Sequence, residues 1–180
     1  MTGEDRAGGP RAPRVAPITE RASLDDGGRA VFDRIVTSRG ALLRPFEVLL
    51  HAPAMAERVA ALGHVVRFGS GLHDADREIA TLATGRAHDC GFIWASHVEA
   101  ARAAGVASET IDALERREPI DGRAGVLVGF VDELCAASSV SDETFATARE
   151  LLGTEGVVEL VVTVGYYTML SFVMGAAGTC

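Results

Sequence analysis

The chain has 180 residues, enough for one domain with a proper hydrophobic core. Hydrophobic residues make up 48% of it and charged residues 23%, which is ordinary for a globular protein and excludes disorder along the whole chain. The net charge of -8 gives no basic surface of the kind that nucleic-acid binders carry, so we expect no nucleic-acid partner.

Residue usage narrows the chemistry further. All 17 basic residues are arginine, so a lysine Schiff base, lysine-anchored pyridoxal phosphate and a P-loop lysine are excluded. The three cysteines, Cys90, Cys135 and Cys180, lie far apart without a C-x-x-C pair, which predicts neither a disulfide framework nor a thiol-disulfide oxidoreductase. The first residues also lack the apolar run of a secretory signal, so we expect a cytoplasmic protein.

The first third of the chain predicts a tail followed by helices. Residues 1–17 are rich in glycine, proline and arginine, which favours a flexible tail and leaves 18–180 as a single helical domain. Apolar residues recur at helical spacing from Asp25 to Arg39, and Gly40 follows as a stop. Short helices are then predicted from Pro45 and from Pro53.

The middle of the chain predicts shorter helices. Asp74 or Asp76 is expected to cap a helix over 77–84, which Gly85 interrupts. Asp89 is expected to cap the next helix, which ends near Gly105, and a short helix starts at Ser108.

The last third predicts a helix from Asp121 to about Ala137, one from Ser141 to Gly153, and an apolar segment over 154–177. This segment approaches the length of a membrane span. Glu159 and its polar residues argue against a span, and we expect a helix buried on all sides or in a subunit interface. With no bounded alternation of strand type, the chain is predicted to be all-α, with about eight helices.

Reactive groups gather on one predicted helix. Cys90, Ile93, Trp94 and His97 follow the i, i+3, i+4, i+7 pattern and share a face, so His97 points inward beside a thiol and an indole. The alternative is that these are packing residues, with His97 satisfied by a backbone carbonyl.

Glu78 borders the apolar face of the preceding helix. As a residue of a first helical turn it could simply be solvated. If it instead faces the same interior as His97, the two groups form a carboxylate–imidazole pair able to move a proton near neutral pH.

Other candidates are less distinctive. His51 sits at a helix end, where a capping role is equally open, and a buried Tyr166 or Tyr167 must find a hydrogen-bond partner or line a polar cavity. Because the histidines lack paired ligand spacing, we expect no metal site.

At these residues the chain resembles the carboxymuconolactone decarboxylase family of the alkylhydroperoxidase D superfamily. The resemblance spans about 15–174 and rests on four segments: GRAVFDRIVTSRG, RPFEVLLHAPAMAERVAALG, REIATLATGRAHDCGFIWASHVEAARAAGV and VELVVTVGYYTML. It implies an all-helical bundle of the alkylhydroperoxidase D type that assembles as dimers, trimers or hexamers. It does not fix one reaction, because the superfamily includes thiol peroxidases and cofactor-free decarboxylases.

Residue by residue, Glu78, Cys90 and His97 match the glutamate, first cysteine and histidine of the peroxidases. Ile93 stands where the peroxidases carry the second cysteine and where many decarboxylase-type members carry an acidic residue. A lone Cys90 could reach only a sulfenic acid that needs an outside reductant. The isoleucine at this position therefore favours Glu78 and His97, and not the thiol, as the reactive groups. We expect them in a pocket lined by Phe92, Ile93 and Trp94.

The sequence thus predicts a cofactor-free decarboxylase, or a related lyase or isomerase, acting on a small cyclic or aromatic acid or lactone. His97 would be the general acid or base and Glu78 its partner, while His51 with Tyr166 or Tyr167 would hold the polar end of the substrate. Two alternatives remain: a thiol-dependent hydroperoxidase that uses Cys90, and a non-catalytic binding or scaffold protein.

Overall fold

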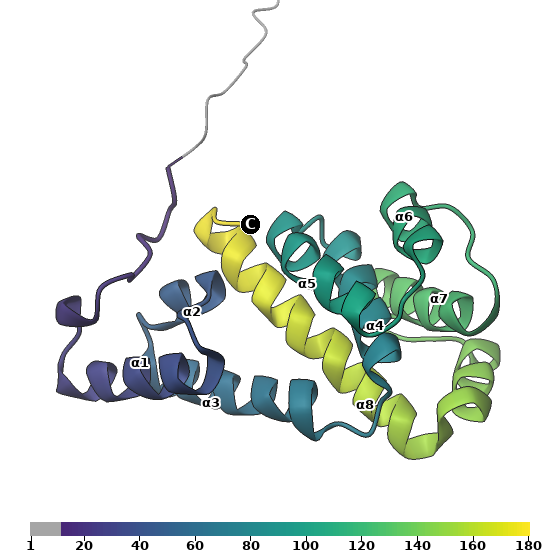
Figure 1. Ribbon diagram of the computed structural model, residues 1–180, viewed down its shortest axis with the longest axis horizontal. Helices are drawn as coiled ribbons and strands as arrows, with labels where there is room; N and C mark the ends of the chain where they lie inside the picture. The colour runs from purple at the N-terminus through teal and green to yellow at the C-terminus, as the bar shows by residue number, and fades with distance from the viewer. Residues whose placement is uncertain (1–11) are drawn as a thin grey trace, which may run out of the picture. The chain divides into compact units, whose positions relative to one another are not determined.

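The computed structural model describes residues 12–180, which form eight α-helices and no strand (Figure 1). The predicted all-α class is confirmed. The α-helices are α1 (Asp26–Arg39), α2 (Arg44–Leu49), α3 (Pro53–His64), α4 (Asp74–Ala87), α5 (Gly91–Ala103), α6 (Ser108–Arg116), α7 (Gly122–Ala137) and α8 (Asp142–Ala177). A 3-10 helix, η1 (Arg21–Ser23), precedes α1, and a π-helix, η2 (Val65–Gly69), follows α3.

The chain divides into two compact units, Met1–Ala56 with Val173–Cys180, and Glu57–Phe172. In the first, the side chain of Asp25 caps α1 by accepting from the backbone N–H of Gly28. Gly40 ends the helix at a φ of 77°, and this stop is the one that the sequence predicts. Residues 1–11 of the predicted tail lie outside the described part. Further along it, the backbone N–H of Arg14 donates to the carbonyl of Ala177 at 2.7 Å.

The second unit is built around α4. Its buried core runs along α4, α6, α7 and α8, and α4 also packs against α5. The residues at this core that are completely buried are Ala80, Leu82, Ala83, Ala101, Leu114, Leu127, Val131, Ala148 and Leu160. A core on several sides of one helix explains why α4 can hold polar side chains away from water.

The predicted boundaries of α4 were wrong. It starts at Asp74 and runs through Gly85 to Ala87, and its N-cap is His73, not an aspartate. A Cβ at Gly85 would lie 2.9 Å from Cγ2 of Ile93, so this glycine permits α4 and α5 to pack closely and does not break the helix. Local propensity predicted a stop where tertiary packing requires a small residue.

Asp89 was also predicted wrongly as a cap. Its φ is 48°, in the left-handed region, and Cys90 occupies the N-cap position of α5. At α8 the prediction was better: the hydroxyl of Ser141 accepts from the backbone N–H of Thr144, and Gly153 introduces a non-helical kink at the predicted boundary.

Within residues 12–180, α8 is the one helix long and apolar enough to cross a membrane. Half of its most apolar 18-residue window is buried in the structure, as in the core helix of a soluble protein. The prediction that the segment over 154–177 is buried on all sides was therefore wrong. Val158, Val161, Val162 and Phe172 are exposed. Burial of this face in a subunit interface stays a prediction.

Candidate functional site

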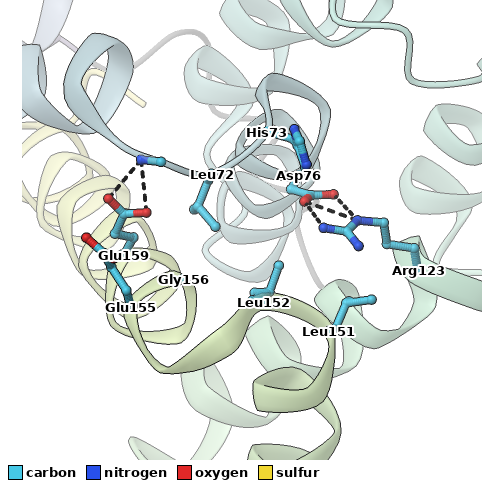
Figure 2. A pocket seen from close by; sticks show the side chains of 10 residues that line it. Leu72, His73, Asp76, Arg123, Leu151, Leu152, Glu155, Gly156 and Glu159 are labelled. Carbon is cyan, nitrogen blue, oxygen red and sulfur yellow. Dashed lines mark hydrogen bonds and ion pairs between the residues drawn. The ribbon is translucent and has the colours of Figure 1, made fainter.

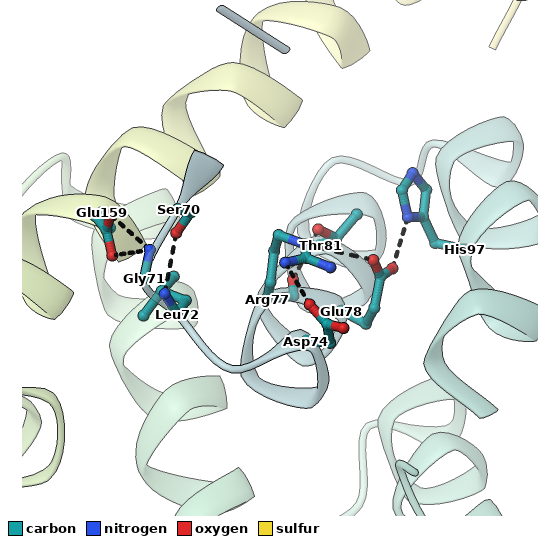
Figure 3. Close-up of polar contacts among 9 residues, drawn as sticks. All are labelled: Ser70, Gly71, Leu72, Asp74, Arg77, Glu78, Thr81, His97 and Glu159. Carbon is teal, nitrogen blue, oxygen red and sulfur yellow. Dashed lines mark hydrogen bonds and ion pairs between the residues drawn. The ribbon is translucent and has the colours of Figure 1, made fainter. Parts of the chain in front are cut away.

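Glu78 and His97 face each other from α4 and α5 (Figure 3). Nδ1 of His97 lies 2.7 Å from Oε2 of Glu78, and the two side chains are only 15% and 9% exposed. A carboxylate can only accept, so Nδ1 carries the proton and Nε2 is the nitrogen left for chemistry. The Glu78–His97 pair is thus arranged as an oriented acid–base couple.

Arg77 places a positive charge beside this pair. Its Nε lies 3.7 Å from Oε1 of Glu78, and its Nη1 pairs with Asp74 at 2.8 Å. The Arg77 side chain is 11% exposed, so its charge acts on Glu78 with limited screening by water. Arg77 therefore places a positive charge beside the carboxylate that orients His97.

Two tyrosines of α8 complete this region. The ring of Tyr167 stands edge-to-face against the imidazole of His97, with centroids 5.0 Å apart, and Tyr166 packs in the same way on Tyr167 at 5.1 Å. Burial, then the charge of Glu78, raise the pKa of Tyr167 well above its usual value. Tyr167 is therefore a neutral phenol at physiological pH.

Two polar contacts anchor the start of α4, which carries Glu78. Asp76 is 3% exposed and makes a bidentate ion pair with Arg123 of α7, with contacts of 2.6 and 2.8 Å (Figure 2). The carboxylate of Glu159 on α8 accepts from the backbone N–H of Gly71 at 2.8 Å (Figure 3). These contacts border a cavity of about 210 Å³. They hold the first turn of α4 against α7 and α8.

Cys90 and Trp94 lie elsewhere. They line a second cavity, of about 300 Å³, together with Gly85, Arg86, Asp89, Gly91, Glu115 and Arg117. Cys90 itself is 1% exposed and is disulfide-bonded, so the prediction that the cysteines form no disulfide was wrong. Neither Glu78 nor His97 borders this cavity, so the sulfur of Cys90 does not share a cavity with the acid–base pair.

The remaining candidates are placed as follows. Ile93 is 2% exposed and packs on Gly85, and Phe92 is half-buried on α5. His51 belongs to the first unit, where its Nε2 donates to the carbonyl of Ala16 at 2.8 Å. Their roles in substrate binding stay predictions.

Sequence reasoning missed Arg77 and Thr81 as parts of this site. Thr81 is completely buried one turn after Glu78, and its hydroxyl donates to the carbonyl of Arg77 at 2.8 Å. The i, i+3 spacing from Glu78 to Thr81 was a usable signal, because it puts both side chains on neighbouring parts of one helix face. Across residues 12–180, no three His, Cys, Asp or Glu side chains converge as a metal site would require.

Residues 53–128, which include α4, α5 and the whole Glu78–His97 pair, match the model of the carboxymuconolactone decarboxylase family. Through this segment, the chain is similar to the carboxymuconolactone decarboxylase family. The resemblance drawn from the sequence is confirmed. No curated protein sequence matches the chain significantly.

Solved structures share the fold of this chain. An uncharacterized peroxidase-related protein from Ralstonia eutropha JMP134, described as an alkylhydroperoxidase AhpD core, aligns with a TM-score of 0.75 at 21% identity, over 94% of this chain and 92% of that one. A peroxidase-related protein from Silicibacter sp. TM1040 aligns at 0.70 and 17% identity, over 97% and 93%. A protein of unknown function from Agrobacterium tumefaciens aligns at 0.64 and 22%, over 72% and 91%. At these identities the likeness establishes the alkylhydroperoxidase D-like helical fold, as predicted, and no reaction.

Proposed function

We propose that this protein is a cofactor-free lyase or isomerase that acts by acid–base chemistry on a small cyclic or aromatic acid or lactone. The observation that carries the proposal is the 2.7 Å contact between Nδ1 of His97 and Oε2 of Glu78, in a largely buried setting. Glu78 fixes the tautomer of His97 and stabilises the imidazolium, so that Nε2 can take up or deliver a proton.

The chemistry needs no group beyond the substrate and these side chains. When a carboxylate next to a carbonyl or an unsaturated lactone leaves as carbon dioxide, its bonding electrons move into an enolate. Protonation of the enolate carbon by Nε2–H of His97 completes the reaction. Nε2 takes up this proton beforehand, from the carboxyl group of the substrate or from water, which forms the imidazolium that Glu78 stabilises. Giving the proton to the enolate carbon restores the neutral Nδ1–H imidazole.

The test is a substrate screen with lactones and β-keto acids, comparing wild type with His97→Ala. Glu99→Gln serves as a matched control, because Glu99 is 82% exposed on the same helix and pairs only with Arg102 among the described contacts. We expect turnover in wild type and in the control, and a loss of at least about 100-fold in His97→Ala. Equal turnover in all three would remove His97 from the mechanism.

A thiol-dependent hydroperoxidase that uses Cys90 is the second candidate, supported by the similarity to two peroxidase-related proteins and by the cavity that Cys90 borders. Cys90 is disulfide-bonded in the structure, so a small-molecule thiol must first reduce that bond. The Cys90 thiolate then attacks a hydroperoxide, leaving a sulfenic acid and an alcohol, and two small-molecule thiols restore the thiol. Mass spectrometry after near-stoichiometric peroxide, with and without prior reduction, decides it. An unmodified Cys90 in both samples rules this candidate out.

A non-catalytic binding protein is the third reading of the same pocket. An aromatic acid that binds without turnover, with affinity unaffected by His97→Ala, would favour this reading over the lyase. We also propose that the protein acts in the cytoplasm and assembles with copies of itself.

A further inference from the structure

Tyr167 contacts the catalytic imidazole more directly than the sequence suggests. Its ring and that of His97 stand at 83° to each other with centroids 5.0 Å apart, a favourable edge-to-face geometry. Tyr167 is only 3% exposed. A side chain so completely covered has little surface left with which to hold a substrate.

The phenol of Tyr167 makes its polar contact with another side chain of the protein. Its hydrogen-bond partner is the side chain of Thr81 on α4. The Thr81 hydroxyl donates to the carbonyl of Arg77, which fixes its position on α4. The contact with Thr81 lowers the pKa of Tyr167, and the phenol stays protonated because burial, the largest effect, raises it.

The other groups around the ring support the same state. Tyr166 also packs edge-to-face on the ring of Tyr167, with the two ring centroids 5.1 Å apart. Glu78 disfavours a second negative charge nearby, while Arg67 acts weakly in the other direction. Burial has the largest effect on the pKa of Tyr167, so the side chain stays neutral. Its ring therefore forms a rigid apolar surface beside His97.

We propose that Tyr167 is a positioning residue that fixes the plane of the His97 imidazole, and that Thr81 fixes Tyr167. Glu78 holds one nitrogen of the imidazole and Tyr167 holds its ring, so the two supports together restrict it to one orientation. This role replaces the substrate contact expected for Tyr167. Its catalytic consequence rests on the proposed acid–base function, but the positioning itself can be measured without turnover.

The first experiment is ¹⁵N nuclear magnetic resonance of the imidazoles in the full-length protein, with the His97 signal assigned by its loss in His97→Gln. In wild type we expect the Nδ1–H tautomer of His97, with a slowly exchanging Nδ1 proton. Tyr167→Leu removes the ring and is expected to give mixed tautomers and rapid exchange. Phe145→Leu, at a 39% exposed aromatic residue early in α8, is the control and should match wild type.

The second experiment tests the anchor by a double-mutant cycle. Tyr167→Phe and Thr81→Val each remove one end of the same hydrogen bond and keep the aromatic ring. We expect each to increase exchange of the Nδ1 proton by a similar factor, and the double variant to be no worse than either single one. These substitutions are mild, so they also cover the case in which Tyr167→Leu does not fold.

Kinetics then separates positioning from substrate contact. On any substrate that wild type turns over, Tyr167→Leu is expected to lower kcat about tenfold and leave KM within about twofold. A raised KM with unchanged kcat would overturn the proposal in favour of substrate binding. An unchanged His97 tautomer and exchange rate in Tyr167→Leu would also overturn it. If wild type turns over nothing, the acid–base function fails, and the resonance experiment still decides the role of Tyr167.

Discussion

Oε2 of Glu78 and Nδ1 of His97 lie 2.7 Å apart although 19 positions separate the two residues in the chain. The contact exists because Gly85 lets α4 and α5 pack closely, which brings the first turns of α4 beside the middle of α5. The glycine taken from the sequence as a break is thus one reason why the acid–base pair forms.

The importance of this contact is tested by Glu78→Gln. A neutral amide can still bond to the imidazole but cannot stabilise its protonated form, so we expect kcat to fall by about 100-fold on the substrates found in the screen. Steady-state kinetics across pH measures this, with Glu99→Gln as the control. A Glu78→Gln enzyme with wild-type kcat at every pH would contradict the assigned role.

Two glycines of α7 give opposite predictions for stability. A Cβ at Gly125 would lie 2.0 Å from the backbone oxygen of Ile120, which cannot move aside without shifting the chain, whereas a Cβ at Gly129 meets nothing within 4 Å. Gly125→Ala should therefore lower the free energy of unfolding by about 3 kcal/mol. Gly129→Ala should raise it by about 0.5 kcal/mol, through better helix propensity.

Urea unfolding followed by circular dichroism measures both changes. Because the two positions lie one turn apart on the same helix, each variant controls for the other. Equal effects of the two substitutions would show that the close approach of Ile120 does not constrain α7.

The stability of the protein should fall in mild acid because of His88. Its Nε2 bonds to the hydroxyl of Thr168 at 2.9 Å and its ring meets the edge of Phe172, while burial lowers the pKa of His88 below 6.5 against the opposing charge of Asp89. Between the unfolded and folded pKa values the unfolded chain binds a proton that the native state does not. Stability is therefore complete above about pH 7 and is lost as the pH falls through 6.5.

The check is a set of thermal melts at pH 7.5 and 5.5 for wild type and His88→Gln. The variant should lose less stability on acidification than wild type, by less than about 1 kcal/mol. His64→Gln is the control, because it removes an exposed histidine of α3 without touching Thr168. An identical loss in wild type and His88→Gln would contradict the prediction.

The sequence predicted those helix ends that depend only on residues close together in the chain. The Gly40 stop and the Ser141 cap depend on residues within four positions of each other, and both were predicted correctly. Gly85 was not, because the reason for a glycine there is Ile93 on another helix. The inward orientation of Glu78 and His97 followed from helical periodicity.

The support of the imidazole by Tyr167 could not be predicted in the same way. It depends on how α8 lies against α5, and periodicity along either helix does not give that arrangement. Nor did the pattern show that Asp76 would be drawn into an ion pair with Arg123 and so be unavailable as a cap. The sequence located the reactive groups, and packing between distant helices decides their partners.

The exposed side of α8 predicts self-association. Val158, Val161, Val162 and Phe172 are 58%, 41%, 41% and 62% exposed, and their spacing puts them on one helix face. No charged residue lies between Val161 and Phe172, so this part of α8 lacks the charges that a water-exposed surface normally carries. We expect a second copy of the chain to cover it, as the oligomers implied by the family resemblance suggest.

Light scattering after size-exclusion chromatography measures the mass of wild type and of Val161→Arg. A charge placed in the centre of an apolar interface must be desolvated, so the variant should dissociate at concentrations where wild type remains assembled. Glu150→Arg, at an exposed position before the Gly153 kink, adds the same side chain away from this face and should keep the wild-type mass. A wild type that is monomeric at every concentration, or a Val161→Arg variant with the wild-type mass, would show that this face is not the interface.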